Sequence, residues 1–91
     1  MPKYVLFYES DEHALQKAPL HFEAHRARWR EFQERGTLLL IGPFANPRGG
    51  AMSVFTSRED AEEFAGSDPF VVNGVVQRWY IREWMEAIGT P

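Results

Sequence analysis

The alternation of apolar and polar positions along the chain predicts four strands. Each is a run dense in β-branched, aromatic and aliphatic residues with turn-forming residues at its ends. These runs lie at residues 3–8, 37–41, 51–56 and 75–84. The first run is apolar almost throughout, which is typical of a strand that is covered on both faces.

Two segments with a helical period lie between these strands. The first is predicted at residues 19–35, with Pro19 tolerated in its first turn and Gly36 as its stop. The second begins after Ser57, where Ser-Arg-Glu-Asp is a variant of the capping box, and it ends before Pro69. Turns or loops are predicted at residues 9–19, 42–43, 44–50 and 73–74.

The resulting order is βαββαβ, the arrangement of the ferredoxin-like α+β fold. It predicts a four-stranded antiparallel sheet with two helices packed on one face. No linker or repeat divides the chain, so residues 1–91 are expected to form a single domain. The second face of the sheet must be polar or covered, and a sheet-to-sheet dimer would cover it.

Composition favours a small homodimeric protein. A chain of 91 residues has a thin core, yet this one contains 3 Trp, 3 Tyr and 7 Phe. Surplus aromatic residues are usual in the interfaces between subunits. A net charge of −3 argues against nucleic acid as a partner. The arginines between Arg26 and Arg35 share their helix with glutamates, which is typical of a solvated mixed-charge face.

Several kinds of chemistry find no support in the sequence. The chain has no cysteine, which excludes disulfides, thiolate zinc sites and cysteine nucleophiles. Gly49-Gly50 precedes a strand and lacks the pattern of a phosphate-binding loop, so no cofactor is expected. No signal peptide and no run of about 18 apolar residues is present, which predicts a cytoplasmic protein with no membrane partner.

A histidine occupies a position that the helical period assigns to the core. Phe22, His25, Trp29 and Phe32 fall within an arc of roughly 80° on the first helix. A buried imidazole requires a hydrogen-bond partner, and a carboxylate is the natural one. Asp68 is the candidate partner, although Asp-Pro also commonly ends a helix by bonding to nearby backbone. Contact between them would create an acid–base pair.

Other candidate residues surround this pair. Tyr8 is the last residue of the first predicted strand and could direct its phenol into a pocket, with Gly42 and Pro43 at the rim, where substrate would bind. His21 lies one turn before His25, and such a pair can chelate a metal, but no third ligand is evident and no metal site is predicted. His13 is expected to be exposed.

An ordered set of motifs resembles the YCII-related proteins over residues 4–84. His25 lies eleven residues before Gly36, as in that family. The remaining motifs are Tyr-Val-Leu-Phe-Tyr at 4–8, Leu-Leu-Ile-Gly-Pro at 39–43, Phe-Thr-Ser-Arg-Glu-Asp at 55–60, Asp-Pro-Phe at 68–70 and Gly-Val at 74–75. The resemblance implies a dimeric α+β barrel with a His-Asp dyad, in which His25 and Asp68 occupy the matching positions.

Two functions stay open at this stage. The first is a small-molecule enzyme in which His25, oriented by Asp68, performs isomerisation or elimination of the dehydrochlorination type without a cofactor. The second is a non-catalytic module that binds a small metabolite or is purely structural, since the sequence contains no evident nucleophile or metal set. Fold alone does not choose between them.

Overall fold

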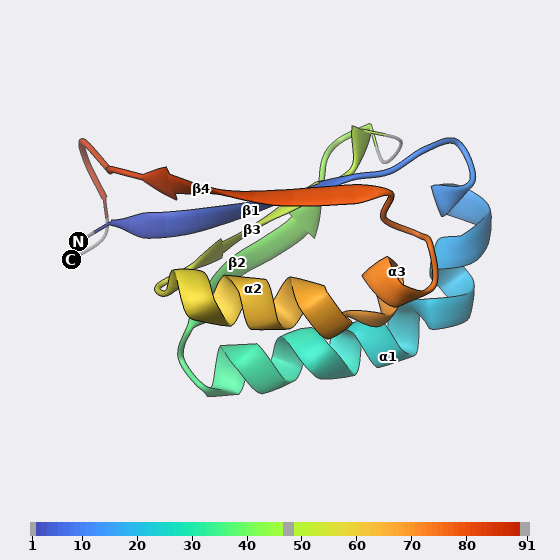
Figure 1. Cartoon of the computed structure of the whole chain (residues 1–91), viewed down its shortest axis with the longest axis horizontal. Helices are drawn as coiled ribbons and strands as arrows, with labels where there is room; N and C mark the ends of the chain where they lie inside the picture. The colour runs from blue at the N-terminus through green and yellow to red at the C-terminus, as the bar shows by residue number, and fades with distance from the viewer. Residues whose placement is uncertain (1, 47–48, 90–91) are drawn as a thin grey trace.

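The computed structural model describes residues 2–46 and 49–89, and its elements follow the expected βαββαβ order with one short helix added (Figure 1). The strands are β1 (Lys3–Glu9), β2 (Leu38–Pro43), β3 (Ala51–Phe55) and β4 (Arg78–Trp84). The helices are α1 (Ala14–Glu34), α2 (Arg58–Ser67) and the added α3 (Pro69–Val72).

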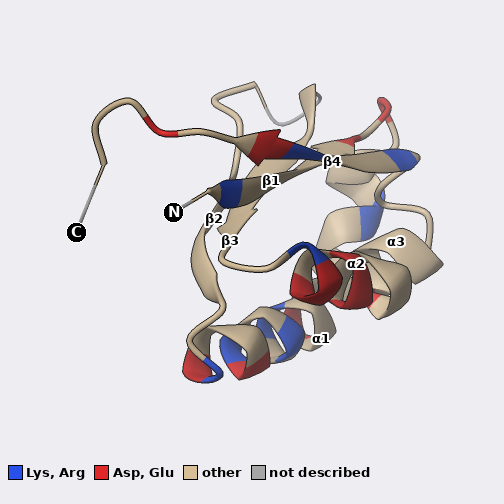
Figure 2. Cartoon of the chain, turned by 60° about the vertical axis from the view of Figure 1, so that its left-hand side comes forward, with Lys and Arg blue, Asp and Glu red and all other residues tan. Residues whose placement is uncertain are grey.

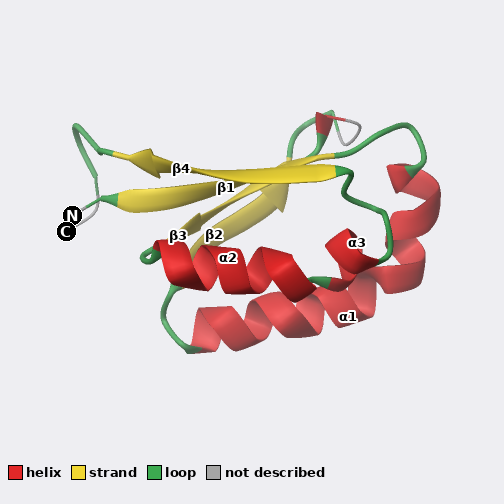
Figure 3. Ribbon diagram, in the orientation of Figure 1, coloured by secondary structure: helices red, strands yellow, loops and turns green. Residues whose placement is uncertain are grey.

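The strands form one antiparallel sheet in the order β2-β3-β1-β4, which confirms the ferredoxin-like α+β fold. In the central strand, Leu6 lies opposite Ser53 of β3 and Ile81 of β4. Alternate residues of a strand point to opposite faces, so Leu6 and Tyr8 face the same side of the sheet. Figure 3 shows α1, α2 and α3 on one side of the sheet.

Three phenylalanines from three elements form the centre of the core. Phe32 of α1, Phe55 of β3 and Phe64 of α2 are fully buried. Their ring centroids are 5.3 to 6.4 Å apart, and Phe32 meets the other two rings edge-on. Burying each such side chain contributes about 2–3 kcal/mol, and the edge-on contacts add to it. This cluster fixes how α1 and α2 lie on the sheet.

Helix α1 begins at Ala14, five residues before the predicted start. The prediction of a loop at 9–19 is therefore wrong for residues 14–19. Asp11 orders the turn that precedes the helix, since its side chain accepts from the backbone N–H of His13 and its carbonyl accepts from that of Ala14. Residues 14–18 are good helix formers, and Pro19 removes only one internal hydrogen bond. Figure 1 shows that α1 bends near this end, because a proline inside a helix kinks it.

The other helix boundaries confirm the local signals in the sequence. Gly36, at φ 83°, donates to the carbonyl of Gln33, while Thr37 donates to that of Phe32. This is a Schellman ending, which favours glycine at the left-handed position. At the start of α2, the Ser57 hydroxyl accepts from the backbone of Asp60.

Two strand boundaries differ from the prediction by more than one residue. Strand β2 continues through Gly42 and Pro43. Proline is tolerated there because β2 is an edge strand, where a residue without an N–H need not donate to a neighbouring strand. Strand β4 begins only at Arg78, because Val75 and Val76 are buried and donate instead to the carbonyl of Phe70. Pro47 of the predicted loop at 44–50 lies outside the described residues.

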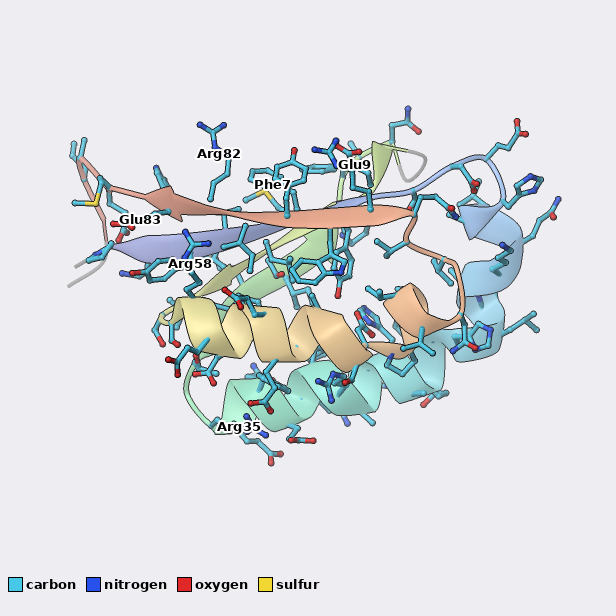
Figure 4. The ribbon with its side chains drawn as sticks, viewed as in Figure 1. Phe7, Glu9, Arg35, Arg58, Arg82 and Glu83 are labelled. Atoms are coloured by element: carbon cyan, nitrogen blue, oxygen red, sulfur yellow. The ribbon has the colours of Figure 1, made fainter. Side chains whose placement is uncertain are left out.

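The face of the sheet that lies away from the helices is largely apolar. It includes Val5 and Phe7 of β1, which pair with Val54 and Met52 of β3. Figure 4 shows Phe7 and Arg82 pointing away from the helices. Leu40 of the edge strand belongs to this face and is 67% exposed. No described helix covers this surface.

Charged residues are mixed along α1 rather than grouped by sign (Figure 2). Arg35, which directly follows this helix, bonds to both Glu31 and Glu63 on the protein surface. Arg28 is used structurally, since it donates to the carbonyls of Glu63 and Phe64 near the end of α2. None of the described helices is both long enough and apolar enough to span a membrane.

Candidate active site

The break between α2 and α3 places a carboxylate inside the protein. Helix α2 ends at Ser67, and Asp68 is extended, with φ −63° and ψ 128°, as expected for a residue before proline. Pro69 is the first residue of α3, where its missing N–H costs nothing. The Asp68 side chain caps this helix by accepting from the backbone N–H of Phe70 at 3.2 Å.

His25 of α1 meets this carboxylate, as the sequence led us to expect. Its Nδ1 lies 2.8 Å from Oδ1 and 3.0 Å from Oδ2 of Asp68. His25 is 7% exposed and Asp68 is fully buried, so water does not weaken the interaction. The two residues are 43 positions apart in the chain, and only the packing of α1 against α3 brings them together.

Tyr8 is the third group on the carboxylate. Its hydroxyl donates to Oδ2 of Asp68 at 2.6 Å. Burial raises the pKa of the Tyr8 phenol far above its usual value, and the neighbouring Asp68 charge raises that pKa further. The phenol therefore stays protonated and acts as a hydrogen-bond donor.

These contacts determine the direction of each hydrogen bond. The backbone N–H of Phe70 can only donate, and the Tyr8 phenol keeps its proton, so Asp68 acts as an ionised acceptor. We therefore assign the proton of the neutral imidazole to Nδ1, which leaves a lone pair on Nε2 of His25. No described residue is hydrogen-bonded to Nε2, and the described part of the chain has no fully buried side-chain nitrogen or oxygen without a hydrogen-bond partner.

The imidazole is also held by aromatic rings. The ring of Phe70 stacks on that of His25 with centroids 3.8 Å apart and planes 7° apart. Phe64 approaches the imidazole at 6.3 Å with an interplanar angle of 61°. Asp68-Pro69-Phe70 thus supplies both the carboxylate and the ring that prevent the imidazole from rotating.

A cavity of about 410 Å³ opens beside His25, between α1 and the sheet. Tyr8, Gly42 and Pro43 all line it, which places the predicted substrate-binding residues around one space. The other lining residues are Ala18, Phe22, Trp29, Ile41, Ala51, Met52, Ser53 and Phe70. Phe22 is 45% exposed, so it borders this cavity rather than the core that its helical position predicted.

Gly50 allows the chain to pass close to Tyr8. Its φ is 93°, and a Cβ atom there would overlap the carbonyl oxygen of Tyr8. Any larger residue would displace the end of β1 and with it the phenol that bonds to Asp68. Glycine at position 50 therefore has a structural reason that the sequence alone did not reveal.

The remaining histidines take no part in this arrangement. The imidazole of His13 is 54% exposed near Glu12. His21 lies one turn before His25 on α1. Within residues 2–46 and 49–89, no group of three or more His, Cys, Asp or Glu side chains is arranged to hold a metal ion.

Comparisons with known proteins agree with this fold. One solved structure is that of 5-chloro-2-hydroxyhydroquinone dehydrochlorinase from Burkholderia phenoliruptrix AC1100, in complex with 2,5-dihydroxybenzoquinone. It matches with a TM-score of 0.76 and 16% identity, over 93% of this chain and 95% of that one. No curated protein matches the sequence. The model of the YCII-related domain matches residues 2–85, so the chain belongs to the YCII-related family.

Proposed function

We propose that the protein is a small-molecule enzyme in which His25 and Asp68 perform acid–base chemistry without a cofactor. The observation that supports this proposal most strongly is that a buried carboxylate holds Nδ1 of His25, while no described residue bonds to Nε2, which lies beside a cavity. A base needs a lone pair within reach of substrate and a partner for the charge it acquires. His25 and Asp68 meet both needs.

The chemistry that fits this pair is isomerisation or elimination. Nε2 of His25 removes a proton from the substrate, and the charge of Asp68 stabilises the imidazolium that forms. In an isomerisation the imidazolium returns a proton to a different substrate atom. In a dehydrochlorination the electrons of the broken bond to hydrogen form a double bond, chloride leaves with its bonding pair, and the imidazolium proton passes to solvent.

The walls of the cavity suit a small, flat organic substrate. Phe22, Trp29 and Phe70 supply aromatic surface, and Gly42 and Pro43 are proposed to contact one edge of the bound molecule. The dehydrochlorinase that shares this fold was solved with a ring compound bound. Its activity supports the class of reaction proposed here and does not identify the substrate.

Deuterium exchange tests the proposal before the true substrate is known. Small lactones and halogenated phenols are incubated with the protein in D₂O, and the loss of ring or α-proton signals is followed by NMR. We expect exchange with one or more of these compounds, and His25→Gln should reduce its rate by a factor of 10²–10⁴. His13→Gln is the matched control, because His13 has no buried carboxylate partner.

A non-catalytic binding module is the alternative. It is favoured if compounds shift the NMR signals of the cavity residues but no proton exchanges at any pH. Exchange that persists in His25→Gln, in a variant with unchanged circular dichroism, also contradicts the proposed mechanism.

We also propose that the protein is a homodimer that pairs through the apolar face of its sheet. Val5, Phe7 and Leu40 lie on this face, which no described helix covers. Burial of such a surface against a second copy is favourable. Analytical ultracentrifugation should show a dimer for the native chain and a monomer for Phe7→Glu, while Arg35→Glu on the helical side should remain dimeric. A native monomer at micromolar concentration contradicts this proposal.

A further inference from the structure

Ser53 occupies an unusual place for a hydroxyl. It lies in β3 between Leu6 of β1 and Ile41 of β2, and its row on the sheet faces the helices. Its neighbours along that row of β3 are Ala51 and Phe55, which are apolar. Ser53 is only 3% exposed. Packing alone would favour alanine or valine here.

The Ser53 hydroxyl has no hydrogen-bond partner within the part of the chain that the structure describes. Burying a hydroxyl without a partner costs stability. The oxygen is not sealed in, since the described residues include no enclosed side-chain oxygen lacking a partner. Ser53 lines the cavity beside His25. Its hydroxyl is therefore available to whatever occupies that cavity.

The register places Ser53 relative to the other polar groups of the cavity. Tyr8 lies opposite Ala51, so Ser53 is its diagonal neighbour on the same face, with an expected separation of about 7–8 Å. His25 reaches the cavity from α1, on the opposite wall. A molecule bound between the helix and the sheet can thus meet His25 on one side and Ser53 on the other.

The charges around the cavity restrict what can bind. None of its described lining residues is Lys or Arg. The carboxylate of Asp68 lies behind His25 and Tyr8, both of which bond to it. A ligand carboxylate would lose its hydration here without gaining a cationic partner, and it would be repelled by Asp68.

We propose that Ser53 orients the substrate by hydrogen bonding to an oxygen substituent on an uncharged, flat ring. The part of the ring that exchanges a proton then lies against Nε2 of His25. This inference rests on the proposed function for the identity of the reaction, but the binding that it describes does not require turnover. Ser53 is thus a specificity-determining residue.

Three related probes test it: hydroquinone, phenol and 4-hydroxybenzoate, each titrated into ¹⁵N-labelled protein. We expect the native protein to bind hydroquinone about tenfold more tightly than phenol, which is the effect on affinity of one net hydrogen bond. Ser53→Ala, and Ser53→Cys with its weakly hydrogen-bonding thiol, should reduce this preference to less than about threefold. Ser10→Ala, which does not line this cavity, should keep it. 4-Hydroxybenzoate should bind more weakly than phenol.

Three outcomes overturn the inference: no tighter binding of hydroquinone to the native protein, a preference that survives in Ser53→Ala, or tight binding of 4-hydroxybenzoate. His25→Gln separates this inference from the proposed function, because it should reduce the rate of proton exchange by a factor of 10²–10⁴ and keep the preference for hydroquinone. If the preference depends on Ser53 but no compound exchanges protons, the enzyme proposal fails and the assignment of the binding group stands.

Discussion

Replacing Tyr8 with phenylalanine removes one oxygen atom from the carboxylate cluster and leaves the packing of the ring in place. The lost bond joins the phenol to a fully buried, ionised Asp68 at 2.6 Å. A hydrogen bond to a charged group contributes about 1.5–3 kcal/mol net. We therefore expect the free energy of unfolding of Tyr8→Phe to be lower by about 2 kcal/mol at pH 8.

The same variant should show a characteristic dependence on pH. Tyr8 has an ordinary pKa of 10.0 in the unfolded chain, and in the folded chain its pKa is raised well above that. Above pH 10 the unfolded chain therefore releases this proton while the folded chain keeps it. The unfolded state then binds fewer protons, so the native protein loses stability as the pH rises. At pH 11 this loss is about 1.4 kcal/mol.

The variant lacks this phenol and does not suffer the loss, so the difference should shrink from about 2 kcal/mol at pH 8 to about 0.6 kcal/mol at pH 11. Urea unfolding followed by tryptophan fluorescence measures it, at one protein concentration throughout. Tyr80→Phe is the control, because Tyr80 stacks on Phe7 and no described residue bonds to its hydroxyl. A difference that is equal at the two pH values, or below 0.5 kcal/mol at pH 8, refutes the reasoning.

Three further substitutions probe the rest of the site. Gly50→Ala should lower the free energy of unfolding by more than about 2 kcal/mol in urea, because the added Cβ overlaps the Tyr8 carbonyl. Gly66→Ala is the control: a Cβ there has free space within α2, and this variant should be more stable than the native protein by up to about 1 kcal/mol. Equal effects of the two substitutions would contradict this prediction. Phe70→Ala should lower the free energy of unfolding by about 2 kcal/mol in the same assay and broaden the NMR signals of the His25 ring. Unchanged signals would show that stacking on Phe70 does not hold the imidazole in place. Asp68→Asn should lower the free energy of unfolding by about 3 kcal/mol and lower the rate of substrate proton exchange by a factor of 10²–10⁴. A folded Asp68→Asn variant with native exchange rates would show that Asp68 takes no part in the mechanism.

The parts of the fold that depend on neighbouring residues could be predicted from the sequence. The Schellman ending at Gly36 and the cap at Ser57 involve residues within five positions of each other. The approach of His25 to Asp68 could be anticipated because the helical period placed an imidazole on a buried face, where it needs a partner. The sequence nevertheless could not show that the two residues meet.

The features that sequence reasoning missed depend on tertiary contacts. Pro19 marked the start of a helix by its usual position, but the better helix formers before it extended α1 to Ala14. Ser53 looks like any serine in a strand until the register places it between Leu6 and Ile41. The contact of Phe70 with His25 follows from α3, a helix of only 4 residues with no periodic signal of its own.

The state of the His25 ring is the most direct test of the central claim, that Asp68 holds Nδ1 and leaves Nε2 free to take a proton. Long-range ¹H–¹⁵N NMR of the imidazole, at a pH where the ring is neutral, reports which nitrogen carries the hydrogen. We expect the proton on Nδ1, which lies 2.8 Å from the carboxylate. A neutral ring protonated on Nε2 would contradict the account, because Nε2 would then have no lone pair for substrate.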